Sequence, residues 1–223
     1  MYCFDRLRQT GIIPVVVLSR AEDAVPTARA LLRGGIDVME ITLRTPAAGD
    51  AIAAVAGSVP EMLIGAGTVL NPGQCELAVR KGANFLVSPG FNQDMAKWCS
   101  SKGIPLIPGC VTPSEIMEAY AMGIRIVKFF PANVYGGLAA LKALSGPFRD
   151  VRFIPTGGIN SENLSDYLCA PWIHAVGGSW VCPRWCSRTR TTMRRPSPSP
   201  STMWTPPPAS PPQSAPSPLW PAC

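Results

Sequence analysis

One repeating pattern constrains this chain more than any other feature: a short apolar run of strand-forming residues followed by a helical pattern, at intervals of about twenty residues. The apolar runs lie at 12–18, 38–44, 62–69, 83–88, 105–109, 124–130, 151–156 and 173–177. The helical patterns between them lie at 22–33, 47–57, 73–81, 93–102, 113–122, 137–145 and 161–169. Strands that alternate with helices pair in parallel through right-handed crossovers. The pattern therefore predicts an α/β fold with a parallel sheet.

Eight strands of this kind close into a (β/α)₈ TIM barrel, which normally takes about 250 residues. Residues 1–180 would form a compact barrel of this type, preceded by a short amphipathic stretch at 2–9. An open, doubly wound sheet is the alternative. No GxGxxG motif opens the first helical pattern, so the barrel is favoured over a dinucleotide-binding sheet.

The composition of the chain changes after residue 180. Residues 181–223 hold 12 of the 25 prolines and five arginines, with no Asp, Glu, Lys or Gly. This composition predicts a disordered or polyproline-like tail, so the eighth helix of the barrel would be missing or replaced. Translation in a shifted reading frame would explain so abrupt a change. A linker, or a docking segment for proline-binding modules, is the alternative.

The charge of the predicted domain argues against a nucleic-acid partner. Five of the 20 Lys and Arg residues and none of the 14 Asp and Glu residues fall in the tail, which leaves 15 basic and 14 acidic residues in the domain. No apolar run approaches the length of a membrane span, and the first eleven residues carry charges, so we expect a soluble cytoplasmic protein. The eight cysteines contain no CxxC pair, and we expect reduced thiols.

A single histidine, His174, limits the possible chemistry. It excludes a multi-histidine metal site, and a Ser-His-Asp triad would depend on this one residue. His174 lies between Ile173 and Ala175 in an apolar run, where we expect a structural core histidine rather than a catalytic one. The sequence therefore predicts no metal site.

Lys128 points to a specific chemistry because it lies in the middle of an apolar run. Alternation along a strand puts it on one face with Ile126 and Phe130. Removal from water disfavours the charged form of lysine and favours a nucleophilic amine that can form a Schiff base with a ketone. The alternative is a structural lysine whose head reaches the strand end or pairs with a carboxylate. The lysines that fall on helical patterns or their ends are Lys81, Lys97, Lys102 and Lys142.

Functional side chains of a barrel gather where the strands end, at their carboxyl termini. There, the second run places Glu40, Thr42 and Arg44 on one face. The hydroxyl residues after the third, seventh and eighth runs are Thr68, Thr156 and Ser179. Glycine pairs at 157–158 and 177–178 could bind a phosphate through backbone N–H groups. In the alternative reading, Glu40 only neutralises Lys128, Arg44 is solvated, and the hydroxyls and glycines are strand-end caps and turns.

Seven motifs near these strand ends resemble, in order, those of the 2-keto-3-deoxy-6-phosphogluconate / 4-hydroxy-2-oxoglutarate aldolase family. They are GGIDVMEITLRT from residue 34, GAGTV from 65, SPG from 88, PG from 108, VKFFPA from 127, PTGGI from 155 and GGSW from 177. The resemblance covers about residues 10–181. It implies a class I pyruvate aldolase on a (β/α)₈ barrel, with no metal and no organic cofactor, that assembles as a homotrimer.

The resemblance also implies a role for each matching residue. Lys128 would be the Schiff-base lysine and Glu40 the general acid/base. Arg44 and Thr68 would hold the pyruvate carboxylate, Pro89 and Phe130 would line the pocket, and Thr156, Gly157, Gly158 and Ser179 would bind a substrate phosphate. The expected reactions are cleavage of 2-keto-3-deoxy-6-phosphogluconate to pyruvate and glyceraldehyde 3-phosphate, and of 4-hydroxy-2-oxoglutarate to pyruvate and glyoxylate. The alternatives are a 2-keto-3-deoxy-6-phosphogalactonate aldolase and an impaired barrel that only binds ligands.

Overall fold

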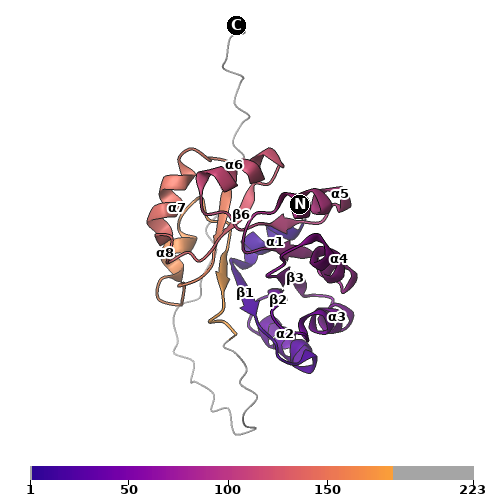
Figure 1. The fold of residues 1–223 in the computed structure, drawn as a ribbon. Helices are drawn as coiled ribbons and strands as arrows, with labels where there is room; N and C mark the ends of the chain where they lie inside the picture. Colours follow the sequence, from indigo (N-terminus) through magenta and orange to yellow (C-terminus); the bar gives the residue numbers. More distant parts are fainter. Residues whose placement is uncertain (1, 183–223) are drawn as a thin grey trace. The chain divides into compact units, whose positions relative to one another are not determined.

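The computed structural model of this chain describes residues 2–182 (Figure 1). Its strands are β1 (Ile12–Val16), β2 (Val38–Thr42), β3 (Leu63–Gly67), β4 (Phe85–Val87), β5 (Leu106–Ile107), β6 (Ile126–Phe129), β7 (Arg152–Pro155) and β8 (Val176–Gly178). Its helices are α1 (Tyr2–Thr10), α2 (Ala24–Arg33), α3 (Ala48–Ser58), α4 (Pro72–Arg80), α5 (Gln93–Lys102), α6 (Pro113–Ala121), α7 (Gly137–Ser145) and α8 (Leu164–Leu168), with a 3₁₀ turn, η1 (Ala21–Asp23), before α2. Each predicted strand and helix is therefore present.

The strands close into a ring. Six of them pair in parallel in the order β5-β4-β3-β2-β1-β8, and β6 pairs with β7. Parallel bridges from Gly109 to Lys128 and from Thr156 to Gly177 join the two sheets. Figure 1 shows α2 to α5 on the right of the strands, α7 and α8 on the left, and α6 at the top, above β6. The predicted (β/α)₈ barrel is confirmed, whereas the predicted tail and the replaced last helix lie, from residue 183 on, outside the described residues.

Successive residues of each strand alternate between the inside of the barrel and the covering helices. On β2, Met39 and Ile41 pack in an apolar cluster shared with the helices, while Val38 packs in a separate inner cluster with Phe85 of β4. A Cβ at Gly65 of β3 would overlap the Phe85 ring, so that glycine leaves room for the ring. The interior of the barrel, on the side where the strands begin, is therefore filled by apolar side chains.

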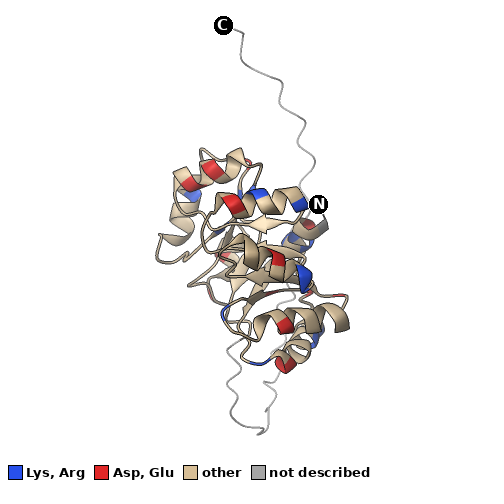
Figure 2. Cartoon of the chain, turned by 45° about the vertical axis from the view of Figure 1, so that its right-hand side comes forward, with Lys and Arg blue, Asp and Glu red and all other residues tan. Residues whose placement is uncertain are grey.

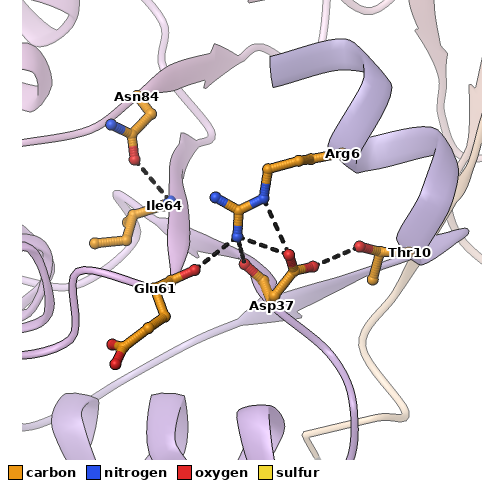
Figure 3. A network of polar contacts seen from close by, with 6 residues as sticks. All are labelled: Arg6, Thr10, Asp37, Glu61, Ile64 and Asn84. Carbon is orange, nitrogen blue, oxygen red and sulfur yellow. Dashed lines mark hydrogen bonds and ion pairs between the residues drawn. The ribbon is translucent and has the colours of Figure 1, made fainter. Parts of the chain in front are cut away.

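Helix α1 packs over the end of the barrel where the strands begin. Leu7 is fully buried in the inner cluster. Arg6 donates to Asp37 Oδ2 from Nε at 3.0 Å and from Nη2 at 2.7 Å (Figure 3). The same Nη2 also donates to the Glu61 carbonyl at 2.6 Å. Thr10 Oγ1 donates to Asp37 Oδ1 at 2.6 Å. Burial raises the pKa of Asp37, but hydrogen bonds from Thr10 and Arg6 outweigh burial and hold this pKa below its ordinary value. These contacts join α1 to the starts of β2 and β3.

We expect Arg6→Ala to lower the free energy of unfolding by about 2 kcal/mol, because hydrogen bonds to charged groups contribute about that much. Urea denaturation would measure the change. Arg8→Ala is the matched control, since Arg8 lies on the same helix and is exposed. We expect it to change the free energy of unfolding by less than about 0.5 kcal/mol. Equal losses in the two variants would contradict this role for Arg6.

His174 also contacts α1, and its Nε2 lies 2.9 Å from the Phe4 carbonyl oxygen. Burial lowers the pKa of the imidazole from 6.5, although the hydrogen bond to Phe4 opposes this. The unfolded chain therefore binds a proton at His174 before the folded chain does. We expect the free energy of unfolding to be fully retained above about pH 6.5 and to decrease as the pH falls below it. Urea midpoints at about pH 7.5 and 5.5 would show this decrease, and His174→Gln should reduce it. A variant with an unchanged decrease would contradict the assignment.

Acidic and basic residues lie side by side on the helices that face the viewer in Figure 2. This mixture agrees with the nearly equal numbers of acidic and basic residues in the predicted domain. Among residues 2–182, no helix is long and apolar enough to cross a membrane. The same residues contain no group of three or more His, Cys, Asp or Glu side chains that could hold a metal ion.

Candidate active site

A buried ion pair lies inside the barrel. Lys128 of β6 is 4% exposed and Glu40 of β2 is 3% exposed, and Lys128 Nζ donates to Glu40 Oε1 at 3.5 Å. The two residues are 88 positions apart in the sequence, and barrel closure brings them together. Because desolvation offsets most of the attraction in a buried ion pair, such a pair contributes little to stability. Its position in a barrel therefore favours a chemical role.

Lys128 faces inward because of the strand alternation that the sequence predicts. Val127 and Phe129 pack in an outer apolar cluster, and Ile126 packs against the inner one. The backbone of Lys128 is paired with the segment after β5, since its N–H donates to the Pro108 carbonyl at 2.8 Å and its carbonyl accepts from Cys110 N–H at 2.9 Å. These bonds fix the amine at the inner face of the strand.

Phe130 continues the inward face of β6, and its ring centroid lies 5.3 Å from Lys128 Nζ. An aromatic ring at this distance shields the amine from water and offers its negative face to a cation. The prediction that Phe130 lies beside Lys128 is consistent with this geometry.

The Glu40 carboxylate packs against Gly67 of the neighbouring strand. In the parallel register of β2 and β3, Glu40 lies opposite Gly65, and Thr42 lies opposite Gly67. A Cβ at Gly67 would overlap Glu40 Oε1 and would lie 2.6 Å from both Cδ and Cγ. The carboxylate therefore occupies space that only a glycine at position 67 leaves. Sequence reasoning did not single out Gly67, although it lies in the GAG motif.

A second polar pair lies where β2 and β3 end. Arg44 is exposed, and its Nε donates to Thr68 Oγ1 at 2.9 Å. Thr68 has φ 56°, a left-handed backbone that costs a β-branched residue about 1–3 kcal/mol. Such strain is typical of residues held for function. The planar guanidinium of Arg44 matches the two oxygens of a carboxylate.

The remaining predicted residues follow β4, β7 and β8. Pro89 lies so close to Gly109, two residues beyond β5, that a Cβ at Gly109 would overlap its carbonyl. Thr156 is buried beside Gly177 of β8. Ser179 is exposed, two residues beyond Gly177. All three therefore lie at the end of the barrel that also holds Arg44 and Thr68, as the sequence predicts.

The glycine pair after β7 has the backbone that its sequence requires. Gly157 and Gly158 have φ 98° and 77°, which favours glycine. The loop after β6 runs beside them, since Asn133 N–H donates to the Gly157 carbonyl at 3.2 Å. Asn163 Nδ2 donates to the Gly158 carbonyl at 3.1 Å. Sequence reasoning missed both asparagines, because their contacts depend on how two loops meet.

Cys110 is the thiol next to the backbone of Lys128. Burial, with a smaller contribution from Glu115 and Glu118, raises the pKa of Cys110 to about 12. Its Sγ donates to the Glu115 carbonyl at 3.6 Å. The thiol therefore stays protonated near neutral pH and does not compete with the amine as a nucleophile.

Comparison with known proteins identifies relatives along nearly all of the barrel. The family model described as KDPG and KHG aldolase matches residues 4–191. A 2-dehydro-3-deoxy-phosphogluconate aldolase of Treponema pallidum (strain Nichols) is 49% identical over 180 residues, which cover 81% of this chain and 86% of the relative. A KHG/KDPG aldolase of Escherichia coli (strain K12) is 49% identical over 180 residues, which cover 80% of this chain and 84% of the relative.

Two solved structures extend the comparison. The KDPG aldolase from Legionella pneumophila, with pyruvate captured at low pH as a covalent carbinolamine intermediate, is 48% identical, with a TM-score of 0.79 over 81% of this chain and 88% of that one. A native KDPGal structure is 28% identical, with a TM-score of 0.69 over 74% of this chain and 81% of that one. The family model, over residues 4–191, spans both β2 and β6.

Proposed function

This chain belongs to the KDPG and KHG aldolase family, and from that premise we propose that it cleaves 2-keto-3-deoxy-6-phosphogluconate to pyruvate and glyceraldehyde 3-phosphate through a Schiff base on Lys128. It is a class I aldehyde-lyase. The observation that carries the proposal is the enclosed amine of Lys128, 3.5 Å from the carboxylate of Glu40. The Legionella relative, which holds pyruvate as a covalent carbinolamine, supports the same chemistry.

In the proposed mechanism, Glu40 accepts a proton from Lys128, and the free amine attacks the C2 ketone of the substrate. Glu40 returns that proton to the oxygen to give the carbinolamine, then takes a second proton from the carbinolamine nitrogen and delivers it to the hydroxyl, which leaves as water. The resulting iminium draws electrons from the C3–C4 bond, and Glu40 takes the proton of the C4 hydroxyl as that bond breaks. Glyceraldehyde 3-phosphate leaves, C3 of the enamine is protonated, and hydrolysis of the iminium releases pyruvate and the amine.

The two ends of the substrate would bind at opposite sides of this amine. We propose that Arg44 and Thr68 bind the carboxylate, which suits a planar guanidinium fixed by a hydroxyl acceptor at 2.9 Å. Pro89 and Phe130 would line the space between the two ends. The residues that we propose for the phosphate are Thr156, Gly157, Gly158 and Ser179. Backbone N–H groups at glycines of positive φ are suited to bind an anion.

The family assignment also supports cleavage of 4-hydroxy-2-oxoglutarate to pyruvate and glyoxylate, because the Escherichia coli relative is named for both substrates. Cleavage of 2-keto-3-deoxy-6-phosphogalactonate is the second candidate. The KDPGal structure is 28% identical to this chain, against 48% for the Legionella KDPG aldolase. The higher identity favours the gluconate-derived substrate.

We also propose a cytoplasmic homotrimer whose catalytic unit is residues 1–180, with no catalytic residue in the tail. Six cysteines in the described part of the chain are free thiols, as expected in a reducing compartment. Sedimentation of the purified protein would test the trimer, since one chain has a mass of 23.7 kDa. Resequencing the coding DNA would test the frame shift, and an intact closing helix in another reading frame would support it.

The proposed function is tested by measuring pyruvate release from the phosphogluconate-derived substrate in an assay coupled to lactate dehydrogenase. The phosphogalactonate-derived substrate and 4-hydroxy-2-oxoglutarate are run beside it. We expect the first substrate to have the highest kcat/KM. Borohydride reduction in the presence of pyruvate, followed by peptide mass spectrometry, should label Lys128. An unlabelled Lys128 and no pyruvate release would contradict an aldolase and leave a ligand-binding barrel.

A further inference from the structure

We infer that Gly67 is a positioning residue for the proposed reaction: its missing side chain sets the place of the Glu40 carboxylate that faces Lys128. The inference rests on the proposed function, because it assigns a role through Glu40. Gly67 lies within β3 and is buried. Its backbone is that of an ordinary strand residue, so an alanine at this position would meet a side-chain obstacle rather than backbone strain.

The obstacle is the catalytic carboxylate itself. Glu40 Oε1 is the oxygen that accepts from Lys128 Nζ at 3.5 Å, and the same oxygen would overlap a Cβ at Gly67. The Cδ and Cγ atoms of Glu40 would lie 2.6 Å from that Cβ, closer than unbonded carbon atoms approach. A methyl group at position 67 therefore requires the whole end of the Glu40 side chain to move.

The surroundings give the carboxylate little room to move without changing its relation to the amine. Glu40 is 3% exposed, and Thr42, the next inward residue of β2, is fully buried. Thr42 Oγ1 donates to the Val16 carbonyl at 3.3 Å, which ties the inner face of β2 to β1. We therefore expect a displaced carboxylate to lose its place beside Lys128 Nζ.

Displacement of a general acid/base by about 1 Å can cost about 100-fold in rate. We expect Gly67→Ala to lower kcat for cleavage by about this factor. The KM should change little, because the atoms nearest to the new methyl group belong to Glu40 and not to Arg44, a proposed carboxylate ligand. The expected loss is thus in proton transfer rather than in substrate binding.

Gly65→Ala is the matched control. Gly65 lies on the same strand and the same inward face, and a Cβ there would overlap the Phe85 ring instead of Glu40. Both variants should unfold at lower urea concentration than the parent, since both overpack the interior. Under conditions where each variant is fully folded, NMR in D₂O would measure the exchange of pyruvate methyl protons for deuterium. Only Gly67→Ala should lose this exchange.

A double-mutant cycle with Glu40→Ala tests whether Gly67 acts through Glu40. With the carboxylate removed, the methyl group at position 67 has space, and Gly67→Ala should cause no further loss of exchange. The same double variant is informative if Gly67→Ala alone does not fold, because with the carboxylate gone the double variant should be as stable as Glu40→Ala alone. A double variant clearly less stable than Glu40→Ala in urea denaturation would place the obstacle elsewhere and overturn the inference.

The remaining outcomes are also decisive. Suppose that the parent is active and that Gly67→Ala exchanges pyruvate protons at a rate within about threefold of the parent rate, or no more slowly than Gly65→Ala. This result would overturn the inference and leave the proposed function intact. The same holds if the loss persists undiminished in the Glu40→Ala background. A parent protein that neither labels Lys128 with pyruvate and borohydride nor exchanges pyruvate protons would overturn both the proposed function and this inference.

Discussion

Lys128→Ala is expected to lower kcat/KM for aldol cleavage by about 10⁵-fold or more, because removing a covalent nucleophile abolishes the path that it provides. The coupled pyruvate assay measures this loss, and borohydride should then label no residue of the barrel with pyruvate. Lys142→Ala is the matched control, since Lys142 is an exposed lysine on α7. We expect it to retain parental activity. Parental cleavage by Lys128→Ala would exclude the Schiff-base mechanism.

The same variant should also be less stable, since it leaves the Glu40 carboxylate buried without its cation. Removing one partner of a buried ion pair costs about 3–5 kcal/mol. The double variant Lys128→Met with Glu40→Gln replaces both charges with groups of similar size and should recover much of this loss. Urea denaturation of the three proteins separates the loss of folding from the loss of chemistry. A stable Lys128→Ala protein without activity would still support the catalytic role.

Glu40→Gln is expected to lower kcat by about 10²–10⁴-fold, the usual contribution of a general acid/base. The amide keeps the shape that fits against Gly67 but accepts no proton at neutral pH. The Lys128 amine remains, so borohydride should still trap pyruvate there, more slowly than in the parent. Single-turnover trapping and steady-state cleavage measured on one preparation would show the difference.

Glu61→Gln controls for the charge change of Glu40→Gln, because Glu61 is exposed and the atom that accepts from Arg6 is its backbone carbonyl oxygen, which the substitution keeps. We expect normal activity in that variant. If Glu40→Gln cleaved the substrate as fast as the parent, another group would have to carry the protons.

The sequence predicts the fold well because each strand and helix of the barrel shows its own apolar periodicity over a short stretch of the chain. Each strand and helix follows from apolar periodicity, and the inward direction of Lys128 follows from alternation within β6. The strands are shorter than predicted; β5, for example, has two residues, Leu106–Ile107, where five were expected. Their outer residues continue into loops, which periodicity alone does not distinguish from strand ends.

Other features of the site depend on contacts across the barrel and were not predictable from one stretch of sequence. The distance from Lys128 to Glu40 requires closure of the ring. The role of Gly67 requires the register of β2 against β3. The strained backbone of Thr68 gives no local signal, since threonine rarely adopts it. The sequence shows the amphipathic stretch at 2–9, but the packing of this stretch over the barrel depends on the contact of Arg6 with Asp37, 31 residues away.

The position of α1 limits where substrate and water can enter the barrel. Leu7 and the inner apolar cluster fill the space on the side of the strand starts, so a substrate would have to reach the Lys128 amine from the end of the barrel where the strands end. The ketone substrate, the aldehyde product and water would then all use the same entrance. A compound bound at this end would block the entry of substrate, the exit of products and the access of water to the iminium at the same time, even if it made no contact with Lys128.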